Sequence, residues 1–141
     1  MKGMKLVLVC AIFIVLLAGG AFAQGTNIKT ASKEGIGNYL TDDKGMTLYF
    51  YKKDSKDKSA CAGDCAARWP IFYVEKASVA GKKLKAKEFA TITREDGKKQ
   101  TTFRGWPLYY FAQDKLAGDT VGQARSDVWY VVDPAAFMKK K

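Results

Sequence analysis

The chain has 141 residues, of which 24 are Lys or Arg and 14 are Asp or Glu, and it contains no His. This length fits one domain with a substantial core. The lack of histidine excludes a CxxCH haem attachment, His-containing zinc sites and His-based general base catalysis, whereas the formal net charge of +10 favours contacts with polyanions.

The first 23 residues have the pattern of a secretory signal peptide. A basic start precedes fifteen apolar residues at 6–20 and the small-x-small sequence Ala21–Ala23. The run is shorter than the roughly twenty apolar residues of a membrane span, so we predict cleavage; a retained anchor is the alternative. Cys10 lies inside the run, which argues against lipidation there. The exported chain then begins near Gln24 with 22 basic against 14 acidic residues, a net charge of +8.

The segment 24–37 is polar and rich in small residues, and we predict a flexible leader. A single β-rich domain over residues 38–141 is expected to follow. Its first two strands flank the turn-forming cluster at 42–45.

The second of these strands is apolar or aromatic on both sides. Leu48 and Phe50 point one way, and Tyr49 and Tyr51 point the other. This pattern is typical of a strand that is covered on both faces.

Two cysteines remain after cleavage, Cys61 and Cys65, and an oxidising compartment favours a disulfide between them. Their CxxxC spacing differs from the CxxC of thioredoxin-like redox motifs, and two thiolates cannot fill a structural zinc site. A redox-active pair and a Cu(I) site with Met46 or Met138 are the alternatives. We predict a disulfide that fixes a local turn, positions Trp69 and stabilises the fold by about 2 kcal/mol.

The second half continues in β structure. Asp96–Gly97 predicts a hairpin within residues 90–103. Further strands are expected at 107–111 and 128–132. Short helices are expected within 61–68, at 85–90 and after Pro134, a residue that suits the first turn of a helix.

An internal repeat runs through the domain at a constant offset of sixty residues. KGMTLYFYKKD at 44–54 aligns with RGWPLYYFAQD at 104–114. The matched pairs are Gly45 and Gly105, Leu48 and Leu108, Tyr49 and Tyr109, Asp54 and Asp114, and Trp69 and Trp129. We therefore predict a mainly β fold, a small single domain of two pseudo-repeated antiparallel β units (about residues 38–74 and 91–134) with one or two short helices.

The pattern Yx[FWY]xxD occurs in each unit. Its residues are Tyr49, Tyr51 and Asp54, followed by CxxxC and Trp69-Pro70, and then Tyr109, Phe111 and Asp114, followed by Trp129. This combination resembles the bacterial family called the secreted repeat of unknown function, also described as predicted lipoproteins with a conserved Yx(FWY)xxD motif. The resemblance covers most of residues 38–133 and implies an exported module without naming its activity. Members often carry a lipobox and Trp-Pro-Pro, whereas this chain lacks the lipobox and has Trp69-Pro70-Ile71.

The motif aspartates each follow an aromatic strand. We predict that Asp54 and Asp114 stabilise turns by accepting backbone N–H groups or a tyrosine hydroxyl. The alternative is an acid–base pair, which requires the two carboxylates to converge in a cleft. Most aromatic rings are expected in the core, and Trp106, after a turn and beside a proline, is the best candidate for an exposed ligand platform.

Lysines cluster at 52–58, 82–87 and 139–141. They are either an ordinary solvated surface or a contact surface for polyanions. We expect anionic envelope polymers or an envelope protein as partners and no specific nucleic acid. Peripheral membrane contact is compatible with the charge, and no transmembrane span is expected in the mature chain.

Enzyme signatures are absent from the sequence, which has no GxSxG elbow, no phosphate loop and no His beside a cysteine. We predict an exported, non-catalytic β domain, periplasmic or extracellular, that binds or organises an envelope component without a cofactor or metal. The alternative is a thiol redox or copper-handling module that uses Cys61 and Cys65.

Overall fold

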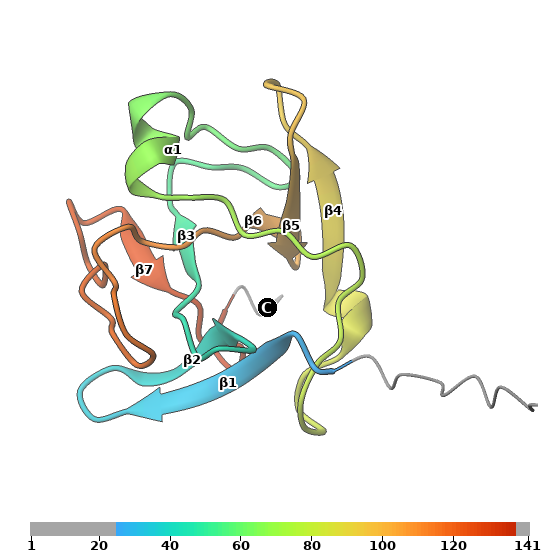
Figure 1. Cartoon of the computed structure of the whole chain (residues 1–141), viewed down its shortest axis with the longest axis vertical. Helices are drawn as coiled ribbons and strands as arrows, with labels where there is room; N and C mark the ends of the chain where they lie inside the picture. Colours follow the sequence, from blue (N-terminus) through green and yellow to red (C-terminus); the bar gives the residue numbers. More distant parts are fainter. Residues whose placement is uncertain (1–24, 138–141) are drawn as a thin grey trace, which may run out of the picture.

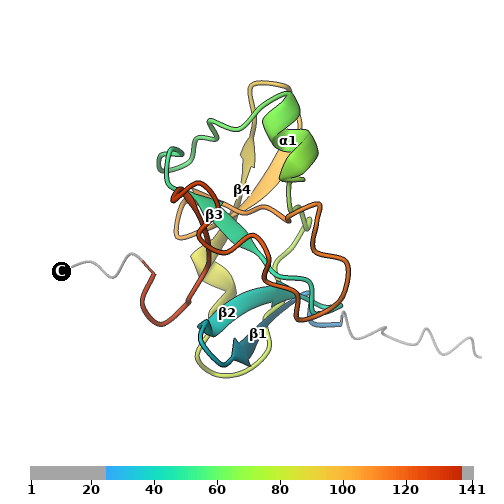
Figure 2. The same cartoon turned by 90° about the vertical axis from the view of Figure 1, so that its left-hand side faces the viewer.

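The computed structural model describes residues 25–137, which form a small β-rich body (Figures 1 and 2). The predicted signal peptide and Lys139–Lys141 lie outside these residues. The strands are β1 (Ile28–Lys33), β2 (Gly37–Asp42), β3 (Tyr49–Tyr51), β4 (Phe89–Thr93), β5 (Lys99–Phe103), β6 (Trp106–Pro107) and β7 (Trp129–Val131). The helical elements are α1 (Asp64–Arg68) and a 3-10 turn at Ala86–Glu88. The mainly β prediction and the helical segments expected within 61–68 and 85–90 are confirmed.

Two hairpins flank the structure. In the first, β1 pairs with β2 in antiparallel register from Ile28 opposite Asp42 to Lys33 opposite Gly37. In the second, β4 pairs with β5, and Gly97 adopts a φ of 81° in the turn between them. A left-handed residue is what such a turn requires, so the hairpin predicted from Asp96–Gly97 is confirmed.

The two halves meet at a pair of backbone hydrogen bonds. The Tyr49 N–H donates to the Tyr109 carbonyl at 2.8 Å, and the Tyr109 N–H donates back to the Tyr49 carbonyl at 3.0 Å. Outside this pair, β3 is joined to β7, and Tyr109 is joined to Ile71.

The backbone hydrogen bonds on either side of the Tyr49–Tyr109 pair join positions that correspond at the offset of sixty. Lys52 N–H donates to the Val128 carbonyl at 2.8 Å, and Ala112 N–H donates to the Arg68 carbonyl at 2.9 Å. The repeat is therefore a structural duplication, with a pseudo-twofold axis between Tyr49 and Tyr109.

Side chains on the two faces of these central strands enter separate apolar clusters. Leu48 and Phe50 contribute to one cluster, and Tyr49 and Tyr51 contribute to the other. The first cluster contains Ile28, Leu40, Leu108 and Val132 among its fully buried members. The second contains the two matched tryptophans and the disulfide. The prediction of a strand covered on both faces is confirmed.

The prediction of a flexible leader at 24–37 is wrong. Residues 28–33 form β1, and the side chain of Ile28 is completely buried. Most other residues of this strand face solvent, so its composition looks like that of a loop, but its backbone pairs with β2 along its whole length. The first unit therefore begins near residue 28 and not at residue 38.

The C-terminal end also differs from the prediction. After Pro134 the described chain makes a hydrogen-bonded turn, in which Phe137 N–H donates to the Asp133 carbonyl, and no helix is formed there. The turn places the ring of Phe137 in the first cluster. None of the helices in residues 25–137 is long and apolar enough to cross a membrane.

Candidate functional site

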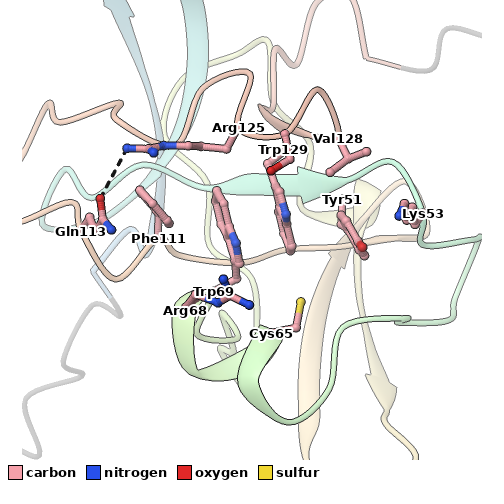
Figure 3. Close-up of a pocket in the computed structure, with 11 residues that line it drawn as sticks. Tyr51, Lys53, Cys65, Arg68, Trp69, Phe111, Gln113, Arg125, Val128 and Trp129 are labelled. Atoms are coloured by element: carbon pink, nitrogen blue, oxygen red, sulfur yellow. Dashed lines mark hydrogen bonds between the residues drawn. The ribbon is translucent and has the colours of Figure 1, made fainter.

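Four aromatic rings from the two units form one continuous stack. The rings of Trp69 and Trp129 lie face to face, with centroids 3.9 Å apart and planes 4° apart. Tyr51 stacks on the outer face of Trp129, and Phe111 stacks on the outer face of Trp69, each at 4.2 Å. Figure 3 shows the row from Phe111 through the tryptophans to Tyr51. The four rings are two pairs of matched positions, so the stack crosses the pseudo-twofold axis.

The two central tyrosines pack edge-on against this stack. The ring of Tyr49 lies 5.4 Å from Trp69 at 76°, and the ring of Tyr109 lies 5.1 Å from Trp129 at 89°. Both tyrosines are completely buried. T-shaped contacts of this kind are favourable because the positive edge of one ring meets the negative face of another.

The motif aspartates bind the tyrosines of the opposite unit. Tyr49 donates its hydroxyl hydrogen to Asp114 Oδ2 at 2.7 Å, and Tyr109 donates to Asp54 Oδ2 at 2.7 Å. The other carboxylate oxygens accept backbone N–H groups, from Val121 at 3.0 Å for Asp114 and from Ala60 at 2.6 Å for Asp54. Each aspartate therefore accepts both a tyrosine hydroxyl and a backbone N–H, the two kinds of partner that we predicted. Because each tyrosine comes from the other unit, these hydrogen bonds link the two halves of the domain.

Burial changes the titration of these groups. The pKa of Asp54 and the pKa of Asp114 are raised by burial, although hydrogen bonds from the tyrosines and backbone oppose the rise. Burial and the neighbouring carboxylate also raise the pKa of Tyr49 and the pKa of Tyr109 well above the ordinary value. Both hydroxyls therefore stay protonated and act as hydrogen-bond donors at neutral pH.

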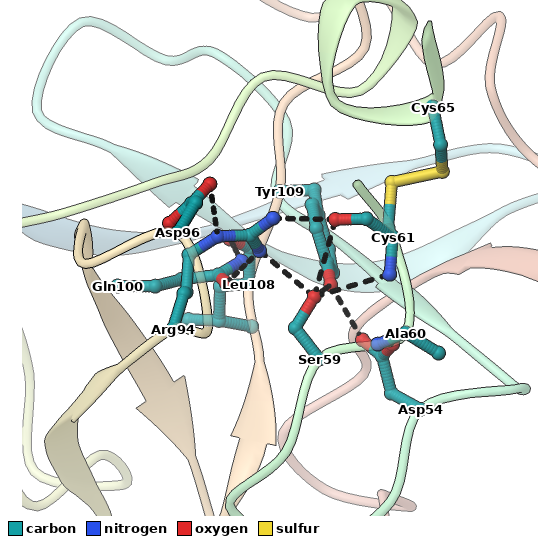
Figure 4. Close-up of a disulfide and its surroundings, with 10 residues drawn as sticks. All are labelled: Asp54, Ser59, Ala60, Cys61, Cys65, Arg94, Asp96, Gln100, Leu108 and Tyr109. Carbon is teal, nitrogen blue, oxygen red and sulfur yellow. Dashed lines mark hydrogen bonds and ion pairs between the residues drawn. A yellow bond between two sulfur atoms is a disulfide. The ribbon is translucent and has the colours of Figure 1, made fainter. Parts of the chain in front are cut away.

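A buried arginine supports one end of this arrangement (Figure 4). Arg94 Nη1 donates to Ser59 Oγ at 2.8 Å and to Gln100 Oε1 at 2.7 Å, and its Nη2 donates to the Cys61 carbonyl. Ser59 Oγ in turn lies 2.7 Å from the Tyr109 hydroxyl. No local signal distinguishes Arg94 in the sequence, because it directly precedes the polar hairpin turn and reads as a surface residue.

Cys61 and Cys65 form the predicted disulfide, with an S–S distance of 2.04 Å. Cys61 is buried in the second cluster, and Cys65 lies at the start of α1, beside the aromatic stack. The short loop that the bond closes leads through α1 directly into Trp69, which is the positioning role that we predicted.

This geometry gives a test of the thiol redox and copper-handling alternative. We expect the disulfide to react more slowly with a mild reductant in the folded domain than in the unfolded one. Cys61 is only 1% exposed, so attack is restricted to Cys65, which is half-buried at the cleft. Thiol titration with and without urea measures the difference, and the urea-unfolded protein is the control. Rapid reduction of the folded protein, or retention of Cu(I) by the reduced form, would contradict a purely structural bond.

The edges of the stacked rings form the floor of an open cleft of about 430 Å³. Its lining includes five positions from each unit that correspond at the offset of sixty. These pairs are Tyr51 and Phe111, Lys53 and Gln113, Cys65 and Arg125, Arg68 and Val128, and Trp69 and Trp129. The cleft therefore lies across the pseudo-twofold axis, with a symmetric aromatic floor and asymmetric walls.

The walls of the cleft are cationic. Lys53, Arg68 and Arg125 line it, and no carboxylate is among the described residues that do so. The guanidinium of Arg125 also lies 5.3 Å from the Phe111 ring centre, at one end of the stack. Because the ring faces cover one another, the floor presents ring edges, which carry partial positive charge. The charges of wall and floor both suit an anion.

The two tryptophans of the stack also carry hydrogen-bond donors that no described residue uses. Neither indole N–H of Trp69 or Trp129 bonds to another described residue, and no buried side-chain nitrogen or oxygen in residues 25–137 lacks a partner. Both N–H groups therefore reach the surface. The two indoles are among the residues that line the cleft, and an indole N–H is a hydrogen-bond donor.

One wall of the cleft has an unusual backbone. Ala124, Ser126 and Asp127 have φ angles of 62°, 50° and 56°, in the left-handed region that residues other than glycine rarely adopt. Such residues cost about 1–3 kcal/mol each and occur often at ligand-binding sites. The segment places Arg125 and Ser126 at the cleft.

Trp106 does not form the exposed platform that the sequence suggested. Its ring is half-buried and packs against Phe50 at 6.1 Å and Phe137 at 6.3 Å in the first cluster. Pro70 has a structural position, since its carbonyl accepts the Tyr110 N–H at 2.7 Å beside Trp69. The two matched tryptophans line the cleft instead.

Comparison with known families agrees with this architecture. The model of the family described as a secreted repeat of unknown function matches the chain twice, at residues 30–72 and 90–133. Each match runs from a flanking hairpin to the end of one unit, and the first includes most of β1. No curated protein and no solved structure matches the chain. On these two matches, which together span more than half of its length, the chain belongs to the family of secreted repeats of unknown function.

Proposed function

We propose that the protein is an exported, non-catalytic binding domain whose cleft holds the anionic groups of a cell-envelope polymer. The observation that carries this proposal is the combination of Lys53, Arg68 and Arg125 with a floor of aromatic edges and no carboxylate. Charge-assisted hydrogen bonds from arginine suit carboxylate and phosphate oxygens.

The open shape of the cleft supports a polymer as ligand. Its cationic residues come from both units, so a chain that crosses the pseudo-twofold axis would meet positive charge from each half. The net positive charge of the whole protein would also draw a polyanion toward the surface before the cleft binds it.

The positions of the carboxylates support a non-catalytic role. Asp54 and Asp114 do not belong to the cleft lining, and both oxygens of each are occupied by a tyrosine hydroxyl and a backbone N–H. These bonds account for both motif aspartates as structural residues.

The test is a pull-down of the oxidised mature domain against envelope fractions at two salt concentrations. We expect the double variant Arg68→Gln with Arg125→Gln to weaken binding at both salt concentrations. Each charge-assisted hydrogen bond that is lost is worth about 1.5–3 kcal/mol, which raises Kd roughly ten- to a hundredfold per bond. Lys82→Gln with Lys83→Gln is the matched control. It removes the same charge outside this cleft, and should matter mainly at low salt.

Two results would overturn the proposal. The first is equal loss of binding in both double variants, which would assign binding to net charge alone. The second is full binding by the Arg68→Gln, Arg125→Gln protein at higher salt, which would place the site elsewhere.

A further inference from the structure

We propose that the stacked tryptophans and the two buried tyrosine–carboxylate pairs form a sink for one-electron oxidation. A strong one-electron oxidant, such as an oxygen-centred radical, removes an electron from the tryptophan pair at the cleft. The electron vacancy then moves to Tyr49 or Tyr109 inside the protein. This activity is independent of anion binding, and it uses the tyrosines and aspartates of the family motif.

The tryptophan pair is placed to react first. Trp69 and Trp129 are 6% and 5% exposed, and the exposed edges lie in the cleft. Their ring planes are nearly parallel, with centroids 3.9 Å apart. Two rings in such contact share a positive charge, which makes the pair easier to oxidise than a single indole.

The route from the tryptophans to the tyrosines is short on both sides of the axis. Trp69 contacts Tyr49 with ring centres 5.4 Å apart, and Trp129 contacts Tyr109 at 5.1 Å. Electron tunnelling falls steeply with distance, so transfer between rings in direct contact is fast. The duplication supplies two equivalent routes from one tryptophan pair.

Each tyrosine has a proton acceptor in place. A phenol that loses an electron becomes a strong acid, and Asp114 Oδ2 lies 2.7 Å from the Tyr49 hydroxyl, as Asp54 Oδ2 does from Tyr109. In the balanced step, the tyrosine gives one electron to the oxidised tryptophan and its proton to the carboxylate. The products are a neutral tyrosyl radical, a protonated aspartate and a restored tryptophan.

Electrostatics favour this final state over an oxidised tryptophan. Lys53, Arg68 and Arg125 repel a positive charge on the indoles. Proton transfer to Asp114 removes a buried negative charge, which burial already disfavours. The electron vacancy therefore comes to rest as a neutral tyrosine–aspartic acid pair.

Burial also protects the product. Tyr49 and Tyr109 have no exposed surface, so a radical on either cannot couple with a tyrosine of another molecule. Tyr73 is 40% exposed and has no such protection. It provides the matched control, because the same substitution can be made at a surface tyrosine.

The experiment oxidises the protein with photogenerated ruthenium(III) tris-bipyridine and follows radicals by electron paramagnetic resonance and transient absorption. We expect a long-lived tyrosyl signal in the natural protein and in Tyr73→Phe. We expect loss of this signal, with a tryptophan radical remaining, in Tyr49→Phe with Tyr109→Phe. A tyrosyl signal that survives in the double variant, or that disappears in Tyr73→Phe, would overturn the proposal.

Two further measurements test the proposal if the Tyr49→Phe, Tyr109→Phe protein does not fold. Asp54→Asn with Asp114→Asn keeps both tyrosines but removes their proton acceptors, and the tyrosyl signal should again be lost. In the natural protein, unfolding in urea should shorten the lifetime of the tyrosyl radical and produce dityrosine cross-links. An equal lifetime in folded and unfolded protein would contradict a protected site. Full polymer binding by the Arg68→Gln, Arg125→Gln protein, which would overturn the proposed function, would leave this result unchanged.

Discussion

Replacing Trp129 with alanine is expected to lower the free energy of unfolding by about 3–5 kcal/mol, the usual cost of removing a large buried aromatic ring. Trp129 stacks on Trp69 and Tyr51 and meets Tyr109 edge-on. Its loss leaves a cavity at the junction of the two units, where rigid neighbouring rings cannot close the space. Urea unfolding followed by far-ultraviolet circular dichroism measures the change.

Trp106→Ala is the matched control for this prediction. Trp106 is half-buried and makes only edge contacts with Phe50 and Phe137, so a smaller loss is expected. A loss at Trp106 equal to or larger than that at Trp129 would show that the stack is not the main apolar junction. The stacked indoles should also give a coupled circular dichroism signal that disappears in Trp129→Ala and persists in Trp106→Ala.

The stack predicts that neither unit folds without the other. Each unit supplies one tryptophan, one flanking ring and one tyrosine, and each aspartate is satisfied by the tyrosine of the other unit. A single unit would expose half of the stack and leave a buried carboxylate without its hydroxyl donor. We therefore regard the pair of repeats as one folding unit.

Much of the fold could be predicted because its signals are local. The continuous apolar and aromatic run at 48–51, the Asp96–Gly97 turn and the offset of sixty all depend on residues that are close in sequence or matched in identity. The strand β1 was missed because it buries few apolar side chains. The repeat did contain the missing information, since the predicted hairpin strand that starts at residue 90 has its counterpart near residue 30.

The site could be predicted only in part, because its key contacts join distant residues. The Yx[FWY]xxD motif identifies the tyrosines and aspartates, but their exchange between units depends on how the two units are placed. The cleft brings together Lys53, Arg68 and Arg125 from separate segments. The sequence favoured Trp106 over the matched tryptophans as a ligand platform because it follows a turn. Proximity to a turn indicates exposure only when no neighbouring element covers the ring.

Removing the Tyr49 hydroxyl with Tyr49→Phe is expected to destabilise the protein by about 1–3 kcal/mol at neutral pH. The substitution leaves Asp114 Oδ2 without its 2.7 Å donor and removes the acceptor of the Gly122 N–H, which lies 3.2 Å from the hydroxyl oxygen. Tyr109→Phe should cost less, because it removes the donor to Asp54 without leaving a backbone N–H unpaired. Its other partner, Ser59 Oγ, keeps its hydrogen bond from Arg94. Tyr73→Phe, at an exposed position, should have little effect.

The dependence of this cost on pH separates the hydrogen bond from simple loss of packing. Burial raises the folded-state pKa of Asp114 above its ordinary value, and the Tyr49 hydroxyl limits that rise. Without the hydroxyl the folded pKa rises further, so stability is lost more steeply as the pH increases from below about 4 through the folded pKa. The difference between the natural protein and Tyr49→Phe should therefore be smallest in acid, where the carboxyl is protonated in both, and reach its full size at neutral pH. Urea unfolding across this range measures it, and a difference that stays constant with pH would show that Tyr49 acts on stability through packing alone.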